Sequence, residues 1–286
     1  MNKIPDTTKI QSINLTVKNL DEALNFYSNQ IGFILLDHTE KIAYLSANGK
    51  EPYIIGLFEN PDAKYPAKDS TGLFHIAVKF LNRKELAKVF LKLFENKVKF
   101  QGFSDHIVSE AVYLADPDGN GVELYADKPK ETWNWRLGQV EMNTLPLNLQ
   151  VLTNALEDED LKTDTIHPDT EIGHIHLKVS DLLKAEKFYS HLLGFNITNS
   201  AYNGALFLSA GGYHHHIGVN VWSSRSGSPL PENLLGLMSF TIKIPDENYL
   251  NLISEKAKSS GIENGKSSDG KIILRDFDNN KIIVTL

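Results

Sequence analysis

The chain has 286 residues, of which 41% are hydrophobic, a formal net charge of −7 at pH 7 and no cysteine. The length accommodates two domains of ordinary size, and the acidic charge argues against a nucleic-acid-binding surface. Without cysteine, disulfides and thiolate ligands are excluded, so a metal site would have to use histidine, aspartate and glutamate. Residues 1–6 lack the apolar run of a signal peptide, and no segment is apolar enough to cross a membrane. We therefore expect a cytoplasmic protein that binds neither nucleic acid nor membranes.

The first elements form a compact unit. Residues 10–17 alternate between apolar and polar side chains, which predicts a strand. Asn19 is suited to cap a helix in which Leu20, Leu24 and Tyr27 recur at helical spacing, and Gly32 would end that helix. Three further strands are predicted over Leu35–Asp37, Ile42–Ser46 and Tyr53–Phe58. The result is a βαβββ module.

The same pattern returns in the second half of the chain. Four residues recur at a constant offset of 162 positions, namely Val17, Leu20, Phe26 and Gly32 as Val179, Leu182, Phe188 and Gly194. Such an offset through strand, cap and helix indicates an internal repeat. Each half also contains a second, weaker unit with a predicted helix, over Arg83–Glu95 and Asn248–Ser260. We therefore predict an α+β fold of four modules, at about 8–60, 70–127, 171–225 and 235–286, in two domains, 8–128 and 171–286, joined by a linker, 129–170.

Two candidate metal ligands lie in the second module. His75 lies on the predicted buried strand Gly72–Val78, and Glu123 lies on a strand that follows the Asp/Gly/Asn turn Asp116–Gly121. A neutral imidazole and a carboxylate on adjacent strands are two of the three ligands of a two-histidine, one-carboxylate iron site. The third ligand has to come from another part of the chain.

Three segments carry a resemblance to a known family: DPDGNGVELYAD at Asp116–Asp127, GHIHLKVSDL at Gly173–Leu182 and GGYHHHIG at Gly211–Gly218. With the tandem βαβββ modules, they resemble the vicinal oxygen chelate superfamily, which includes glyoxalase I, the bleomycin-resistance proteins and the type I extradiol dioxygenases. The resemblance covers nearly all of the chain except the linker, and it is most specific for two-domain catechol 2,3-dioxygenases. It implies that paired modules form barrel-like mixed sheets with a metal inside.

In that superfamily one module gives a histidine from its first strand, and its partner gives a histidine from its first strand and a glutamate from its last. The second module has His75 and Glu123, and the third has His174, which the offset aligns with Ser12 of the first. The fourth module has Ser239 and Ile283 at the corresponding positions. A complete ligand set of His75, His174 and Glu123 arises only if module 2 pairs with module 3, and module 1 with module 4. The resemblance therefore implies an exchanged pairing.

The resemblance also implies catalytic residues. Extradiol enzymes carry a tyrosine ten residues before the glutamate ligand, which corresponds to Tyr113, and a loop histidine before it, for which His106 is the best match. A third role belongs to an acid/base histidine, and the pattern His-x-aliphatic-small selects His215. In a regular strand, alternation would turn His214 and His216 to the opposite face. An alignment with glyoxalase I instead makes His216 a fourth metal ligand, so this choice stays open.

The resemblance implies a non-haem Fe(II)-dependent extradiol dioxygenase that cleaves a catechol-like diol with O2, with Mn(II) or Ni(II) as other candidate metals. Two alternatives remain. One is another metal-dependent enzyme on the same scaffold, such as a glyoxalase or thiol transferase, and the other is a metal-free protein that binds small molecules. The expected partners are a small aromatic substrate and O2, and the protein could form a homo-oligomer.

Overall fold

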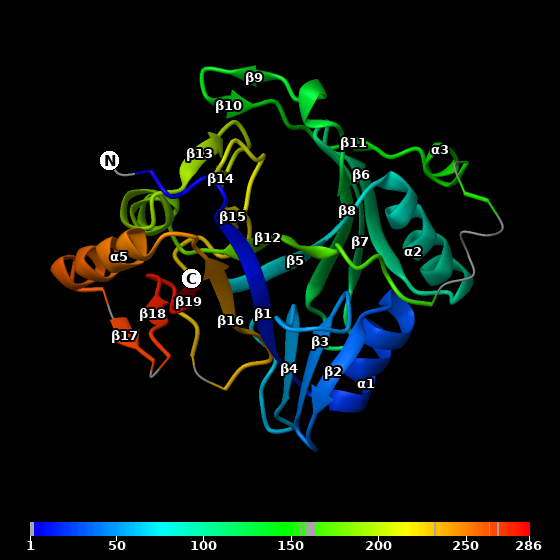
Figure 1. Ribbon diagram of the computed structural model, residues 1–286, viewed down its shortest axis with the longest axis horizontal. Helices are drawn as coiled ribbons and strands as arrows, with labels where there is room; N and C mark the ends of the chain where they lie inside the picture. Colours follow the sequence, from blue (N-terminus) through cyan, green and yellow to red (C-terminus); the bar gives the residue numbers. More distant parts are fainter. Residues whose placement is uncertain (1–2, 155, 158–163, 232, 263, 268) are drawn as a thin grey trace.

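The computed structural model describes residues 3–154, 156–157, 164–231, 233–262, 264–267 and 269–286. Its strands form two large mixed sheets, accompanied by a few short or medium helices (Figure 1). The eight-stranded sheet has the order β17 (Asn264–Lys266), β18 (Ile272–Arg275), β19 (Lys281–Thr285), β16 (Gly236–Lys243), β1 (Lys9–Val17), β4 (Ile55–Glu59), β3 (Ile42–Ser46) and β2 (Ile34–His38). The nine-stranded sheet has the order β11 (Leu145–Pro146), β6 (Phe100–Asp105), β7 (Ser109–Ala115), β8 (Gly121–Asp127), β5 (Gly72–Phe80), β12 (Glu171–Lys178), β15 (Ile217–Asn220), β14 (Ala205–Ser209) and β13 (Asn196–Asn199).

Each large sheet joins one module from each half of the chain. The eight-stranded sheet contains the first and fourth modules, which meet where β1 pairs antiparallel with β16. The nine-stranded sheet contains the second and third modules, which meet where β5 pairs antiparallel with β12. The α+β class and the exchanged pairing are therefore confirmed. The division into segments 8–128, 129–170 and 171–286 stays a prediction, and each sheet contains strands from both halves.

The helices begin where the sequence provides caps. The side chain of Asn19 accepts a hydrogen bond from the Glu22 amide at the start of α1 (Leu20–Leu24), and Asp181 does the same for Lys184 in α4 (Leu182–Glu186). Both helices continue as π-helical segments, Asn25–Ile31 and Lys187–Leu192. The longer helices are α2 (Arg83–Glu95) and α5 (Glu247–Ser259), and α3 (Leu149–Thr153) is short.

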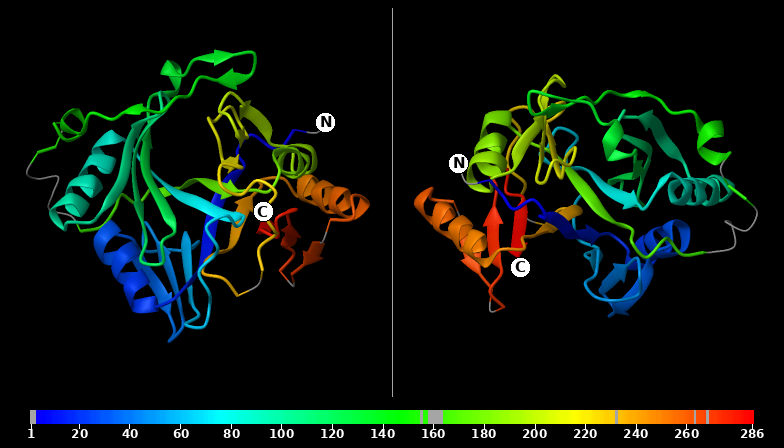
Figure 2. Two further views of the ribbon diagram at one scale, coloured as in Figure 1. Left: turned by 180° about the vertical axis from the view of Figure 1, so that it is seen from behind. Right: turned by 45° about the horizontal axis from the view of Figure 1, so that its top comes forward.

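The two sheets share one apolar core. Buried side chains from both sheets and from the covering helices form a single contiguous hydrophobic cluster. Strands β1 and β12 contact each other at the seam, and both further views show the two sheets side by side around it (Figure 2). Because the seam is packed, β12 and β5, which carry two of the candidate ligands, contact strands of the other sheet as well as their neighbours in their own sheet.

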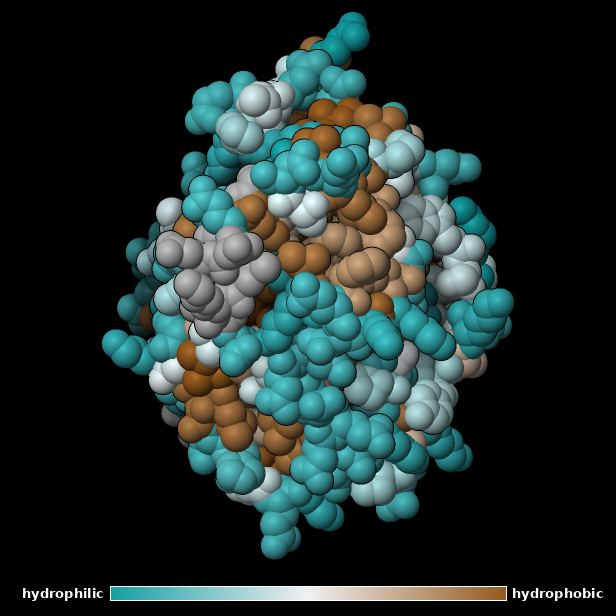
Figure 3. Space-filling view, turned by 90° about the vertical axis from the view of Figure 1, so that its right-hand side faces the viewer, coloured by the Kyte–Doolittle hydropathy of each residue, from teal (hydrophilic) through white to brown (hydrophobic). Residues whose placement is uncertain are grey.

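The segment between the halves contains secondary structure of its own. A helical turn at Lys130–Thr132 precedes β9 (Trp135–Arg136) and β10 (Gln139–Val140), which form a separate two-stranded ribbon, and β11 then adds to the edge of the nine-stranded sheet. The side of the molecule with α1, α2 and α3 is mostly polar, with apolar patches between (Figure 3). Among the described residues, no helix combines the length and the apolar character needed to cross a membrane.

Candidate metal centre

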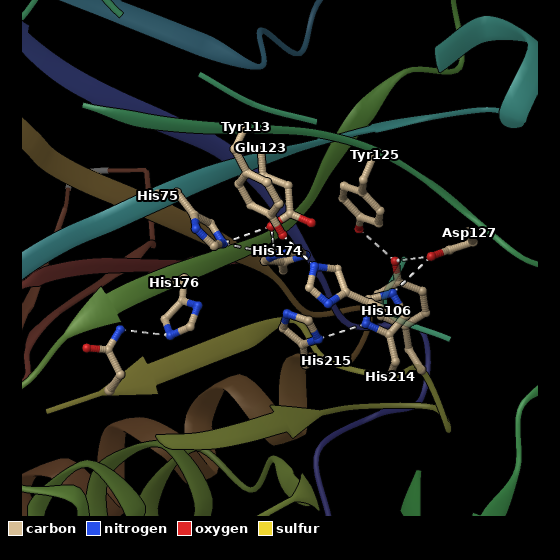
Figure 4. Close-up of polar contacts among 12 residues, drawn as sticks. His75, His106, Tyr113, Glu123, Tyr125, Asp127, His174, His176, His214 and His215 are labelled. Carbon is tan, nitrogen blue, oxygen red and sulfur yellow. Dashed lines mark hydrogen bonds and ion pairs between the residues drawn. The ribbon is translucent and has the colours of Figure 1, made fainter. Parts of the chain in front are cut away.

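Three predicted ligands converge in the nine-stranded sheet (Figure 4). His75 on β5 and His174 on β12 each direct Nε2 at Glu123 on β8, with distances to Glu123 Oε2 of 3.0 and 3.2 Å. The two Nε2 atoms lie 3.3 Å apart, and all three side chains are buried. Within the described part of the chain, this is the one group of at least three potential ligands that could hold a metal ion.

Strand register explains this convergence. β5 pairs with β8 so that Ala77 lies opposite Glu123, and it pairs with β12 so that Ala77 also lies opposite His174. Because side chains alternate along a strand, His75 shares the face of Ala77. The small Ala77 leaves space between the larger side chains. Gly121 lies opposite His75, and a Cβ there would clash with the Phe74 carbonyl oxygen and approach His75 Cβ to 3.0 Å.

His174 and Glu123 have the protonation states that a metal requires of its ligands. Burial lowers the pKa of His174 to about 4, so its ring is neutral at neutral pH. Burial alone would raise the pKa of Glu123, but the contacts with His174 and His75 more than offset this and hold it well below its usual value. Neutral imidazoles and an ionised carboxylate are the forms that bind divalent metals.

The spacing of the donor atoms fits a single ion. Neighbouring ligands of an ion with bonds of about 2.1 Å lie roughly 3.0 Å apart in octahedral geometry and roughly 3.4 Å apart in tetrahedral geometry. The observed separations of 3.0, 3.2 and 3.3 Å lie within this range. Two imidazoles and one carboxylate also match the ligand set of non-haem iron sites. The residues present therefore fit a divalent transition metal.

Tyr113 and His106 form a pair at the edge of the same cavity. The cavity has a volume of about 390 Å³, and its lining includes the three candidate ligands. His106 Nδ1 lies 2.9 Å from the Asn143 carbonyl oxygen, which can only accept, so Nδ1 carries the proton. His106 Nε2 then accepts from the Tyr113 hydroxyl at 2.6 Å. Burial, followed by the charge of Glu123, raises the pKa of Tyr113 well above its usual value, so the hydroxyl stays protonated.

Three consecutive histidines point in different directions. They lie in a bent segment before β15 rather than in a strand, so the alternation expected of a strand does not apply. His215 lines the cavity, and its ring centroid is 4.0 Å from that of His174. His214 is fully buried and does not line the cavity. The Nδ1 atom of His216 instead lies 3.0 Å from Ser209 Oγ, and His216 is absent from the cavity lining, so the structure does not bring it to the other ligands.

The structure adds residues to the cavity that the sequence alone did not indicate. Met142 and Thr144, from the segment between the halves, line it together with Phe207 and Trp222. His176 also lines it, because it follows His174 by two residues and shares its face of β12. Its Nε2 accepts a hydrogen bond from the Asn220 side-chain amide at 3.0 Å, and burial lowers its pKa well below the usual value. Period-two alternation from His174 does indicate His176, but the residues between the halves carry no such signal.

Comparisons with known proteins bear on the family and the fold. The family model for the Glyoxalase/Bleomycin resistance protein/Dioxygenase superfamily matches residues 9–124. A catechol-2,3-dioxygenase of Bacillus subtilis (strain 168) is 44% identical over 264 residues, which cover 91% of this chain and 91% of that protein. A solved structure from Bacillus subtilis subsp. subtilis str. 168 matches with a TM-score of 0.67 at 15% identity and covers 99% of this chain and 86% of its own. A glyoxalase I variant from Zea mays has a TM-score of 0.60 at 15% identity, with 97% and 92% covered. From the relative that is 44% identical over nearly its full length, we conclude that this chain is a member of the glyoxalase/bleomycin resistance protein/dioxygenase superfamily.

Proposed function

We propose that this chain is a non-haem Fe(II)-dependent extradiol dioxygenase that cleaves the ring of a catechol-like diol with O2. The observation that carries the proposal is the convergence of three buried side chains, His75, His174 and Glu123, at one cavity, in a chain that is 44% identical to a catechol-2,3-dioxygenase. The donor set favours Fe(II), because two histidines and one carboxylate leave open positions typical of iron oxygenases. Fe(II) held by these three residues would bind the diol and O2 and would lower the pKa of the bound hydroxyls.

The side chains around the ligands have matching roles. The Tyr113 hydroxyl donates to His106 and retains lone pairs, so it can accept a hydrogen bond from a substrate hydroxyl. His215 lines the cavity beside His174 and is the side chain that would take a proton from the diol. These two residues give the cavity one hydrogen-bonding group and one proton acceptor.

The walls of the cavity suit an aromatic ring. Its volume of about 390 Å³ lies within the range for small-molecule sites. Phe74, Phe207 and Trp222 line it, and the Phe74 and Trp222 rings lie 5.4 Å apart in an edge-to-face arrangement. Aromatic side chains favour flat apolar ligands through offset and edge contacts. A catechol would thus bind its ring to the apolar wall and its oxygens to the polar end.

The test uses protein purified anaerobically and loaded with Fe(II). We expect about one iron per chain, consumption of O2 on addition of catechol and a yellow ring-cleavage product that absorbs visible light. Iron retention without O2 consumption across a panel of substituted catechols would contradict the proposal. The glyoxalase-like alternative requires His216 as a fourth ligand. The Nδ1 atom of His216 bonds Ser209 instead, away from the other donors, and this contact argues against that alternative. Metal-dependent turnover of a glutathione hemithioacetal without O2 uptake would favour that alternative.

A further inference from the structure

A chain of hydrogen bonds leads from His215 to a carboxylate outside the cavity (Figure 4). His215 Nδ1 lies 2.7 Å from His214 Nδ1, and His214 Nε2 lies 2.9 Å from Asp127 Oδ1. The His214 ring is fully buried, whereas the Asp127 side chain is 20% exposed. Asp127 lines a second cavity with Lys79 and Glu171, and this cavity shares no lining residue with the first.

The direction of these hydrogen bonds follows from the carboxylate. Burial alone would raise the pKa of Asp127, but the contact with His214 and the charge of Lys79 outweigh it and lower the pKa, so the group is ionised at neutral pH. An ionised carboxylate only accepts, so His214 donates from Nε2. An imidazole that carries its single proton on Nε2 accepts at Nδ1, so the Nδ1–H of His215 donates to His214. Nε2 of a neutral His215 therefore carries a lone pair.

Neighbouring residues hold the carboxylate in this orientation. Tyr213 also donates to Asp127 Oδ1, at 3.2 Å, and its hydroxyl lies 2.7 Å from that of Tyr125. Gly173 makes this possible, because a Cβ at that position would clash with the Tyr125 hydroxyl. The Trp133 ring packs against His214 with centroids 5.3 Å apart. Since the surroundings are packed, Asp127 and His214 have little freedom to adopt another arrangement.

We propose that Asp127 and His214 are positioning residues that fix His215 in the tautomer with its proton on Nδ1 and a lone pair on Nε2. This inference rests on the proposed function, in which His215 takes a proton from the substrate. Neither positioning residue lines the cavity, so neither contacts the substrate. They act through the orientation and tautomer of His215, in the way that a carboxylate orients the histidine of a nucleophilic triad.

The test compares two variants with a control. Asp127→Asn places an amide where the carboxylate was, and its NH2 group can donate to His214 Nε2 and reverse both hydrogen bonds. His214→Phe keeps a ring but leaves His215 Nδ1 without its partner. His216→Gln is the control, because it changes a half-buried histidine in the same segment that lies outside the cavity and bonds Ser209.

We expect both variants to retain the metal content of the parent, to lower kcat roughly 10- to 100-fold and to change KM less than about threefold. The control should change kcat less than about threefold. Nitrogen-15 NMR of Zn(II)-loaded protein with labelled histidine supplies a readout that does not depend on turnover. In the parent, His215 should show a protonated Nδ1 and an unprotonated Nε2, and in Asp127→Asn this pattern should be lost or reversed.

Either of two NMR results would overturn the inference. One is an unchanged tautomer of His215 in both variants, and the other is a parent in which Nε2 of His215 already carries the proton. If the parent cleaves no catechol but the tautomer changes as expected, the proposed function fails while the positioning by Asp127 and His214 stands. If catechol is cleaved and both variants turn over at the parental rate, the proposed function stands and the inference fails.

Discussion

The side-chain amide of Asn14 donates to the hydroxyl of Ser239 at 3.0 Å. These two residues occupy the positions in the eight-stranded sheet that His176 and His75 occupy in the nine-stranded sheet. Asn14 lies opposite Ser239 between β1 and β16, as His176 lies opposite His75 between β12 and β5. The eight-stranded sheet thus holds a neutral, mutually hydrogen-bonded pair where the nine-stranded sheet holds imidazoles. Since neither group is a strong ligand for a divalent transition metal, we expect one metal site per chain.

The first prediction concerns the ligands. His75→Ala, His174→Ala and Glu123→Ala should each reduce bound iron from about one per chain to less than about a tenth, because two remaining donors hold a divalent ion weakly. Metal analysis of protein dialysed against metal-free buffer measures the loss. Thermal unfolding provides a second measurement, because an ion that binds only the folded state raises the Tm of the parent. No such rise is expected in the three variants.

Ser239→Ala is the matched control for these variants. It occupies the position in the eight-stranded sheet that corresponds to His75, and it removes a buried hydrogen bond with Asn14. We expect a loss of about 1–2 kcal/mol in the free energy of unfolding without a change in metal content. Equal iron in the parent and in His174→Ala would contradict the assignment of His174 as a ligand.

The second prediction concerns Tyr113. Tyr113→Phe removes the hydroxyl that donates to His106 Nε2 but keeps the ring and the metal ligands. We expect unchanged metal content and a kcat lowered roughly 10- to 100-fold, because a hydrogen bond at the reacting oxygen acts mainly in the transition state. Single-turnover kinetics with catechol should locate the loss after substrate binding. A variant that loses only affinity for catechol would show that the hydroxyl acts in binding.

The convergence of the three candidate ligands and the pairing of modules could be predicted from the family resemblance, because both depend on regular strands. Once His75, Glu123 and His174 are assigned to strands, alternation and register bring them to one face of a sheet. The contact between His106 and Asn143 does not depend on regular strands. Their contact joins a loop to the segment between the halves across 37 residues, and it uses a backbone carbonyl that any residue could supply. Contacts of this type leave no pattern in the sequence.

The contact between His214 and Asp127 could not be predicted from the sequence either. The two residues are 87 positions apart, and the bent backbone before β15 turns His214 toward β8 in a way that strand alternation does not predict. Strand alternation alone does place Asp127 on the face of Glu123, because it follows Glu123 by four residues on β8. A polar residue on the ligand face of a ligand strand is a candidate support for the site.

The third prediction concerns substrate affinity. Phe74 lines the cavity, is 40% exposed and lies with its ring 5.0 Å from that of His176. Phe74→Ala should raise KM for catechol roughly 10-fold, which corresponds to the loss of about 1.5 kcal/mol of aromatic contact, with little change in kcat. Phe94→Ala is the control, because Phe94 is 61% exposed on α2 and does not line the cavity. Equal KM in both variants would exclude Phe74 from the substrate contact.

The fourth prediction concerns the pH dependence of stability. The Tyr27 hydroxyl donates to Asp116 at 3.0 Å, and the Tyr189 hydroxyl donates to Asp276 at 2.7 Å. These two contacts tie the π-helical segments to the turns of the following modules. Burial raises the pKa of both Asp116 and Asp276 to about 6. Hydrogen bonds from Asn120 to Asp116 and from Asn280 to Asp276 lower the pKa but do not outweigh burial.

Because the folded pKa of Asp116 exceeds the unfolded value near 4, folding favours its protonated form. Its contribution to stability is therefore fully present below about pH 4 and is lost as the pH rises through 6, by up to about 3 kcal/mol. Asp116→Asn stays neutral and escapes this loss. Urea unfolding at pH 4, 5, 6 and 7 should thus show the stability of the parent falling relative to that of Asp116→Asn. If the hydrogen bonds to the carboxylate outweigh its burial, the parent will instead gain stability relative to the variant over the same interval, and the turn will behave as an ionised carboxylate site.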